Sequence, residues 1–245
     1  MTPVLTAKDL LDLWERGLTN PPLQRALDLL ALAYPELSLE ELRELPIGQR
    51  DTRLLELREA LFGPRLNCLT NCPQCGERLE MAFDIAQLRA IPPDSSSDGP
   101  YSIVLDDYDV EFRLPNSGDM SRIVDLSDTA ETRQTLFEMC VQQARRAGVP
   151  ISASDLPSEL VLAAGARMAE LDPHADMKIA LTCPACSSQW STTFDIASYL
   201  WIEINAWAVR LLHEIHCLAF AYGWREPDIL SLSPMRRQFY LELIG

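Results

Sequence analysis

The sequence predicts a mostly helical α+β fold that is organised around two copies of a short cysteine motif. Cys72-Pro73-Gln74-Cys75 recurs 111 residues later as Cys183-Pro184-Ala185-Cys186, and seven of the fifteen positions from Cys72 onward are identical in the second copy. Helical periodicity dominates the rest of the chain, and a β-hairpin pattern lies between the two motifs. We therefore expect two cysteine knuckles that form a split zinc-ribbon-like centre, with a hairpin and helices inserted between them.

Each copy of the motif predicts a tight cysteine turn, a strand that leads away from it, and an aspartate that caps a helix. Two residues between the cysteines allow one turn to direct both sulfurs at a single ion. Four thiolates are the ligand set of a structural tetrahedral zinc site, which has no open position to activate water. The predicted ligands of a structural Zn²⁺ are Cys72, Cys75, Cys183 and Cys186.

Several alternatives to one shared zinc remain open. The two pairs can act as redox dithiols, although the surrounding pattern is not the strand–CxxC–helix arrangement of thioredoxins. They can also bind separate ions, or pair across an oligomer. Iron satisfies the same four sulfurs as zinc.

The residues before the first motif predict helices. Thr6 is a suitable cap for a helix over 6–16, and a second helix is expected over 23–34. Ser38 and Glu41 form a capping-box pattern for a short third helix. A fourth helix is expected over 49–62, with its leucines inside and Arg50, Asp51, Arg53 and Arg58 largely outside.

The segment between the motifs begins with a polar Pro/Ser/Gly-rich stretch, 91–100, which is typical of a flexible linker. Strands over 101–105 and 110–114 flank Asp106 and Asp107, a pattern that predicts a hairpin. Helices follow over 129–147 and 157–171, the second of them capped by Ser154 or Asp155. A strand over 179–181 leads into the second cysteine turn.

The longest predicted helix, 196–222, follows the second motif and carries an apolar stripe of helical period. Gly223 is suited to end this helix. Ser233 and Pro234 are suited to begin a last helix over 235–244. We accordingly divide the chain into an N-terminal helical region (1–66), a cysteine core (67–90 and 178–245), a linker (91–100) and an inserted α+β subdomain (101–177).

Composition restricts the function. The formal net charge is −15 and the pI is near 4.6, which argues against binding nucleic acid, because affinity for phosphates depends on clustered Lys and Arg. We expect no secretory signal, no membrane span and, from seven cysteines, a reducing cytoplasm.

Other residues that suggest chemistry have simpler interpretations. His213 and His216 are spaced for a second metal site, with His174 or Cys140 as further ligands, or, together with Glu214, for an enzyme active site. Cys68 is a possible substitute ligand, but a small buried residue is the simpler interpretation. Asp106, Asp107 and Asp109 lack the glycine and distal glutamate of a calcium loop. No nucleophile elbow, phosphate loop or dinucleotide motif occurs, so we expect no enzymatic activity.

Several segments carry a family resemblance: 45–51 (LPIGQRD), 57–64 (LREALFGP), 72–76 (CPQCG), 112–115 (FRLP), 221–226 (AYGWRE), 229–233 (ILSLS) and 236–237 (RR). They resemble proteins encoded in the gene clusters of contractile tails, including phages and extracellular contractile injection systems. The chain is also similar, from about residue 23 onward, to the baseplate hub assembly proteins (chaperones) of T-even phages.

This resemblance implies a non-enzymatic protein that helps to build a contractile baseplate, as a chaperone or as a minor hub component. The implied partners are baseplate or spike subunits, met in the bacterial cytoplasm during assembly, with retention in the finished particle as the alternative. A competing hypothesis is a zinc-ribbon regulatory or adaptor module that binds protein or nucleic acid.

Overall fold

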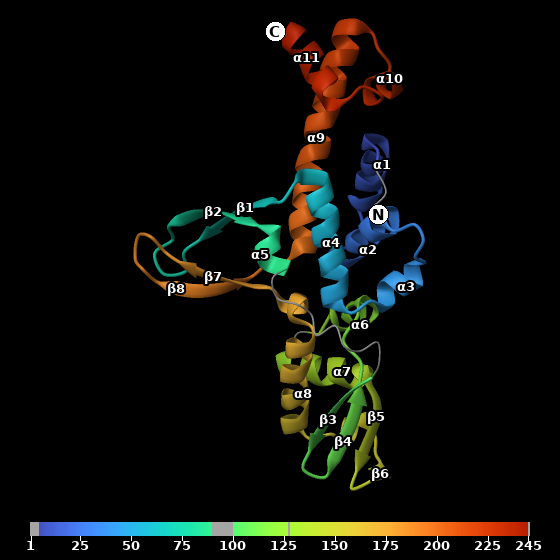
Figure 1. Cartoon of the computed structure of the whole chain (residues 1–245), viewed down its shortest axis with the longest axis vertical. Coiled ribbons are helices and arrows are strands. Elements are labelled where there is room, and N and C mark those ends of the chain that lie inside the picture. The colour runs from blue at the N-terminus through green and yellow to red at the C-terminus, as the bar shows by residue number, and fades with distance from the viewer. Residues whose placement is uncertain (1–4, 90–99, 127, 245) are drawn as a thin grey trace. The chain divides into compact units, whose positions relative to one another are not determined.

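The computed structural model describes residues 5–89, 100–126 and 128–244 (Figure 1). Its chain divides into two compact units. The first unit contains residues 1–35 and 197–245, and the second contains residues 36–196. The predicted linker, 91–100, lies outside the described residues except for its last position. In the part of the chain that the structure describes, no helix is long and apolar enough to cross a membrane.

The first unit begins with helices α1 (Ala7–Gly17) and α2 (Pro22–Ala33), close to their predicted bounds. Thr6 caps α1 through a complete capping box with Asp9. Arg25 of α2 stacks on Trp201 with its guanidinium carbon 4.6 Å from the ring centroid and donates a hydrogen bond to the carbonyl of Gly17.

The same unit contains almost all of α9 (Ile196–Tyr222), together with α10 (Glu226–Leu230) and α11 (Pro234–Ile244). Helix α9 has its predicted bounds, and Gly223 follows it with a positive φ of 68°, as expected for a C-terminal cap. The short helix α10 was not predicted. A hydrophobic core joins α1, α9 and α10 through buried residues Leu11, Ala208, Leu211, Ile215, Leu218 and Ile229.

The second unit begins with α3 (Leu39–Glu44), which has the predicted capping box between Ser38 and Glu41, and α4 (Ile47–Phe62). The prediction that the charged residues of α4 face outward is wrong for three of them. Arg50, Asp51 and Arg58 are buried, because each has a polar partner. Arg50 Nε donates to Asp51 Oδ1 over 2.7 Å, and Arg58 donates to the carbonyl of Gly63 over 2.6 Å.

Two antiparallel hairpins carry the cysteine turns. The first consists of β1 (Arg65–Asn71) and β2 (Arg78–Asp84), followed by the short helix α5 (Ile85–Arg89). The second consists of β7 (Lys178–Thr182) and β8 (Gln189–Thr193). The strands β2, β7 and β8 agree with prediction, whereas β1 was missed.

The inserted segment has its own sheet and core. The predicted hairpin is present as β3 (Tyr101–Leu105) and β4 (Tyr108–Phe112) at one edge of a sheet of order β3-β4-β5-β6. One face of this sheet packs against helices α7 (Thr129–Cys140) and α8 (Ser158–Leu171), with Val110, Phe112, Phe137 and Leu160 at the centre. Asn116 caps the intervening helix α6 (Ser117–Ile123).

Two predictions in this segment are wrong. The helix expected over 129–147 ends at Cys140, and Val141–Arg146 forms β5, which pairs with β4 and continues into β6 (Val149–Pro150). Pairing with β4 places Ala144 in the core, so tertiary contacts override the helical pattern. Neither Ser154 nor Asp155 caps α8, whose N-cap is Pro157; Ser152 instead caps the 3₁₀ turn η1 (Ala153–Asp155).

Two points along the insert contact the N-terminus of α4. The backbone N–H of Ile47 donates to the carbonyl of Pro115 over 3.1 Å. The N–H of Gly48 donates to Asp172 Oδ2 over 2.8 Å, just before the 3₁₀ turn η2 (Pro173–Asp176). Two backbone donors that a helix leaves without internal partners are therefore used to anchor the insert.

Candidate metal centre

The two cysteine turns have the same local structure at equivalent positions. In the first, the N–H of Gly76 donates to the carbonyl of Cys72 over 2.9 Å, and the N–H of Cys72 donates to the carbonyl of Glu77 over 2.8 Å. In the second, Ser187 donates to Cys183, and Cys183 donates to Ser188, both over 2.9 Å. The repeated sequence therefore folds into repeated structure, 111 positions apart.

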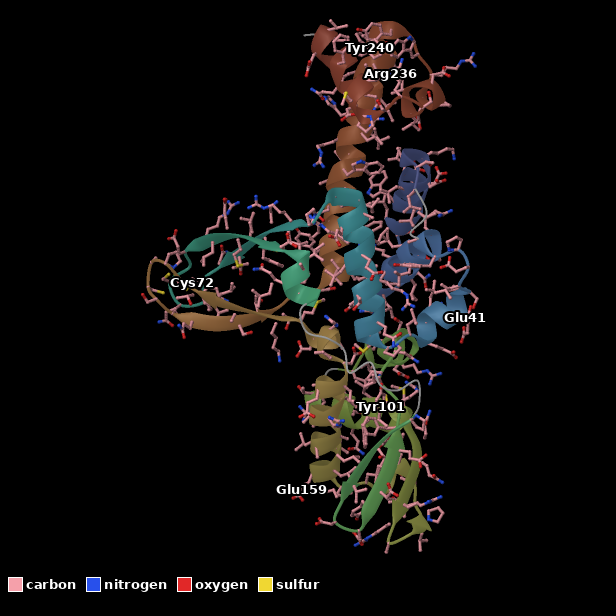
Figure 2. The ribbon with its side chains drawn as sticks, viewed as in Figure 1. Glu41, Cys72, Tyr101, Glu159, Arg236 and Tyr240 are labelled. Atoms are coloured by element: carbon pink, nitrogen blue, oxygen red, sulfur yellow. The ribbon has the colours of Figure 1, made fainter. Side chains whose placement is uncertain are left out.

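The structure brings the four predicted metal ligands together. The sulfurs of Cys72, Cys75, Cys183 and Cys186 all lie within 4.8 Å of one another. The Sγ atoms of Cys72 and Cys186 are 3.7 Å apart, and those of Cys75 and Cys183 are 3.6 Å apart. A disulfide needs about 2.05 Å, so these cysteines are free thiols. Figure 2 labels Cys72 near the tips of the two hairpins.

These sulfur distances fit a tetrahedral ion. Zinc–thiolate bonds of about 2.3 Å arranged as a regular tetrahedron place neighbouring sulfurs about 3.8 Å apart. The two close sulfur pairs differ from that spacing by roughly 0.2 Å or less. The group is thus compatible with a metal ion held between the hairpins.

The hairpins meet with approximate two-fold symmetry. In each close pair, the first cysteine of one turn approaches the second cysteine of the other. Phe83 and Phe194, which are equivalent in the repeat, contact each other edge to face with ring centroids 5.7 Å apart. Their relationship is the one expected of two copies that pack around a common axis.

A small apolar layer supports the sulfurs. Cys72 and Cys183 are only 2% and 1% exposed, whereas Cys75 and Cys186 are exposed. The equivalent residues Leu79 and Trp190 pack against the two buried cysteines. Alternation in the strand that follows each turn could identify these two supports from sequence, because each lies four residues after the second cysteine of its turn.

Their surroundings give the thiols of Cys72 and Cys75 different pKa values. Loss of hydration opposes ionisation of Cys72, but the backbone N–H groups of Cys75 and Gln74 and the thiols of Cys186 and Cys75 lower its pKa to about 7. The N–H of Glu77 favours the Cys75 thiolate, yet the other three sulfurs and loss of hydration raise the pKa of Cys75 to about 12. Four thiolates at this spacing therefore require a cation to balance their charge.

The other residues considered as ligands do not join this group. Among the described residues, only the four cysteines form a group of three or more possible ligands. His213 Nε2 lies 3.7 Å from the sulfur of Cys217, and His216 stacks on Phe220. His174 is buried, with its Nε2 3.2 Å from the carbonyl oxygen of Leu88.

The remaining candidates have structural surroundings. Cys68 lies within β1, and Cys140 is buried with its sulfur 3.9 Å from a guanidinium nitrogen of Arg113. Asp106 has a positive φ of 53° in the β3–β4 turn, and Asp107 pairs with Arg146 over 2.8 Å. These aspartates therefore occupy the turn, as expected.

Comparison with known proteins identifies one family. A family model described as T4 bacteriophage base plate protein matches residues 23–201, which is more than half of the chain and includes both cysteine turns and the insert. No curated protein and no solved structure matches the chain. The predicted resemblance to phage baseplate proteins is confirmed.

Proposed function

Because this chain belongs to the T4 bacteriophage base plate protein family, we propose that it is a non-enzymatic assembly protein of a contractile-tail baseplate. It acts either as a chaperone or as a minor hub component, and its partners are baseplate or spike subunits. The observation that carries this proposal is the family match over residues 23–201. The proposal covers phage-like contractile tails and, by extension, contractile injection systems.

We further propose that the four-cysteine group binds one structural Zn²⁺ and that the two hairpins form a split zinc ribbon around it. The ligands are Cys72, Cys75, Cys183 and Cys186, whose sulfur spacing suits a tetrahedral ion. A bound ion closes a loop of 107 residues between Cys75 and Cys183. Cross-linking a loop of about 100 residues reduces the entropy of the unfolded chain by an amount equivalent to about 4–5 kcal/mol.

The chemistry of the site supports the non-enzymatic part of the proposal. Four thiolates complete the coordination of zinc, so the metal has no position for a substrate or an activated water. Its role is to hold the two hairpins together. The net charge of −15 favours protein partners over nucleic acid.

Affinity purification tests the proposed function. The tagged protein is isolated from its native host during tail assembly and, separately, from purified finished particles, and the bound proteins are identified by mass spectrometry. A variant with all four metal-ligating cysteines replaced by serine provides the control for the metal centre. Each sample is also treated with nuclease to remove proteins that are bridged by nucleic acid.

The outcomes separate the competing roles. Recovery of baseplate or spike subunits from assembling cells, but not of the protein from finished particles, identifies a chaperone. Recovery from both identifies a hub component. Recovery of nucleic acid without tail subunits would overturn the proposal in favour of a zinc-ribbon regulatory module.

A further inference from the structure

Helix α11 exposes an apolar stripe. Met235, Phe239 and Leu243 are 83%, 59% and 63% exposed, and their spacing of four residues places them on one side of the helix. The exposed side chain of Arg236 lies next to this stripe in sequence. Figure 2 labels Arg236 and Tyr240 on this helix.

The opposite side of α11 is fixed to its own unit. Tyr240 and Leu241 pack against the core that α1, α9 and α10 share. Arg237 is buried, pairs with Glu214 over 3.0 Å and donates to the carbonyl of Leu232 over 2.8 Å. The apolar stripe therefore does not hold the helix in place, and its exposure needs another explanation.

An open groove lies elsewhere on the same unit. Its volume is about 560 Å³, and residues of α1, α9 and α10 line it. Leu11, Leu212 and Leu230 provide apolar lining. Glu15 and Glu226 contribute exposed carboxylates, whereas Asp12 is neutralised by Lys8 at 2.6 Å. The groove therefore combines apolar lining with uncompensated negative charge.

The stripe and the groove have complementary chemistry. The stripe offers three apolar side chains next to one guanidinium, and the groove offers an apolar lining next to two carboxylates. All of these residues lie outside the segment 23–201 that the baseplate family model matches. The family assignment therefore does not account for either surface.

We propose that the groove of one copy of this chain binds the α11 stripe of a second copy. Met235 and Phe239 enter the space lined by Leu11, Leu212 and Leu230. Arg236 then approaches the carboxylates of Glu15 and Glu226. Both surfaces are exposed in a single copy, so the contact forms between two copies. Because the two surfaces differ from each other, they join subunits either head to tail or by reciprocal exchange.

Sedimentation of the metal-loaded full chain tests this proposal. We expect the average mass to rise above that of one chain as the protein concentration increases. Phe239→Ser removes the central apolar anchor and should weaken association by about thirtyfold or more, the loss typical of an interface hot spot. Leu243→Ser should also weaken it, whereas Leu162→Ser, at a residue 52% exposed on α8 of the other unit, should not.

Reversal of charge tests whether Arg236 of one copy approaches the carboxylates of the groove in the other copy. Arg236→Glu should weaken association by roughly two- to fivefold for each ion pair lost. Adding Glu226→Arg to that variant should restore it. Both variants change exposed side chains, so their circular dichroism should match that of the original protein.

Three results would overturn the proposal. The first is a single-chain mass at all concentrations. The second is an association that Phe239→Ser leaves unchanged. The third is failure of the charge reversal to restore binding, which would assign the surfaces to different partners. None of these results bears on the baseplate assignment, because the groove and the stripe lie outside the matched residues.

Discussion

Gly76 and Ser187 occupy the same position in the two cysteine turns, and both have a left-handed backbone, with φ of 77° and 58°. Each donates its N–H to the carbonyl of the first cysteine of its turn, over 2.9 Å. Glycine adopts this conformation freely, whereas an L-residue with a Cβ is strained in it by roughly 1–2 kcal/mol. The second turn therefore carries a strain that the first avoids.

Ser187→Gly should raise the free energy of unfolding by about 0.5–1 kcal/mol, because it relieves this strain while adding some freedom to the unfolded chain. Gly76→Ala should lower it by about 1 kcal/mol. No atom lies within 4 Å of a Cβ added at Gly76, so the loss comes from the backbone alone.

Denaturant unfolding of the metal-loaded protein measures both changes. Gly165→Ala in α8 is the matched control, because a Cβ there also meets no atom within 4 Å and the φ is ordinary. It should stabilise the protein by up to about 1 kcal/mol. A stabilising Gly76→Ala would show that the left-handed turn does not form.

The cysteine repeat shows how much of this site was available from sequence. Two motifs of four residues predicted both turns, the strands after them and the four residues that converge. The approximate two-fold axis and the contact of Phe83 with Phe194 were not predicted, because a linear repeat does not specify how its copies face each other. The preceding strand β1 was missed, although the helix before it was predicted to end at residue 62, because β1 is defined by its pairing with β2 along its whole length.

Replacing any one of the four clustered cysteines with serine should remove the metal and destabilise the protein. Each supplies one of four sulfurs within 4.8 Å, and three remaining thiolates hold a closed tetrahedral site poorly. We expect one zinc per chain by elemental analysis of the original protein and well under half of that in each variant. The loss of unfolding free energy should reach about 4–5 kcal/mol, if cross-linking of the long loop is the main contribution.

Cys217→Ser serves as the control, since that cysteine lies on α9 with its sulfur 3.7 Å from His213 Nε2 and does not belong to the four-sulfur group. It should retain full metal content. A quadruple cysteine variant that unfolds at the same denaturant concentration as the original protein would contradict the structural role. Iron in place of zinc in the native protein would retain the four-sulfur site and change only the ion.

Where prediction failed elsewhere, long-range contacts decided the structure. Residues 141–146 were predicted to form the end of a helix, but they pair with β4 as a strand, and Ala144 is buried in the core. Arg50 and Asp51 were predicted to be exposed, but they are buried together beside Ser117, which is 67 positions away from Arg50. Neither partner is visible within a window of neighbouring residues.

Gly48→Ala should destabilise the second unit by roughly 2–4 kcal/mol. An added Cβ would lie 1.8 Å from Oδ1 of Asp172 and 3.0 Å from the backbone nitrogen of Ala175. The hydrogen bond from Gly48 to Asp172 must then break, which frees one end of the insert from α4. Thermal unfolding measures the loss.

A double-mutant cycle with Asp172→Ala tests the cause. Removal of the carboxylate makes space for the Cβ, so Gly48→Ala should cost at least about 1 kcal/mol less in the Asp172→Ala background, since this much coupling is common for residues in contact. Equal costs in both backgrounds would contradict the predicted clash.

The raised pKa of Asp51 should make the stability of the protein depend on pH. Burial raises its pKa above the ordinary 3.8, Arg50 opposes that effect, and Asp195 and Asp172 reinforce it. A carboxyl whose pKa is raised on folding binds protons more readily in the folded protein. Its favourable contribution is therefore full below pH 3.8 and is lost as the pH rises through the raised value.

Asp51→Asn should consequently gain stability relative to the original protein as the pH rises through this window. Asp128→Asn should show the opposite trend, because the N–H groups of Glu131 and Ala130 lower the pKa of Asp128, and the ionised carboxylate contributes stability that is lost as the pH falls. The measurement is the difference in unfolding free energy between each variant and the original protein, both taken at the same pH, so that acid release of metal affects both alike. Parallel slopes for the two variants would contradict the assignment of Asp51 as a carboxyl whose pKa is raised by burial.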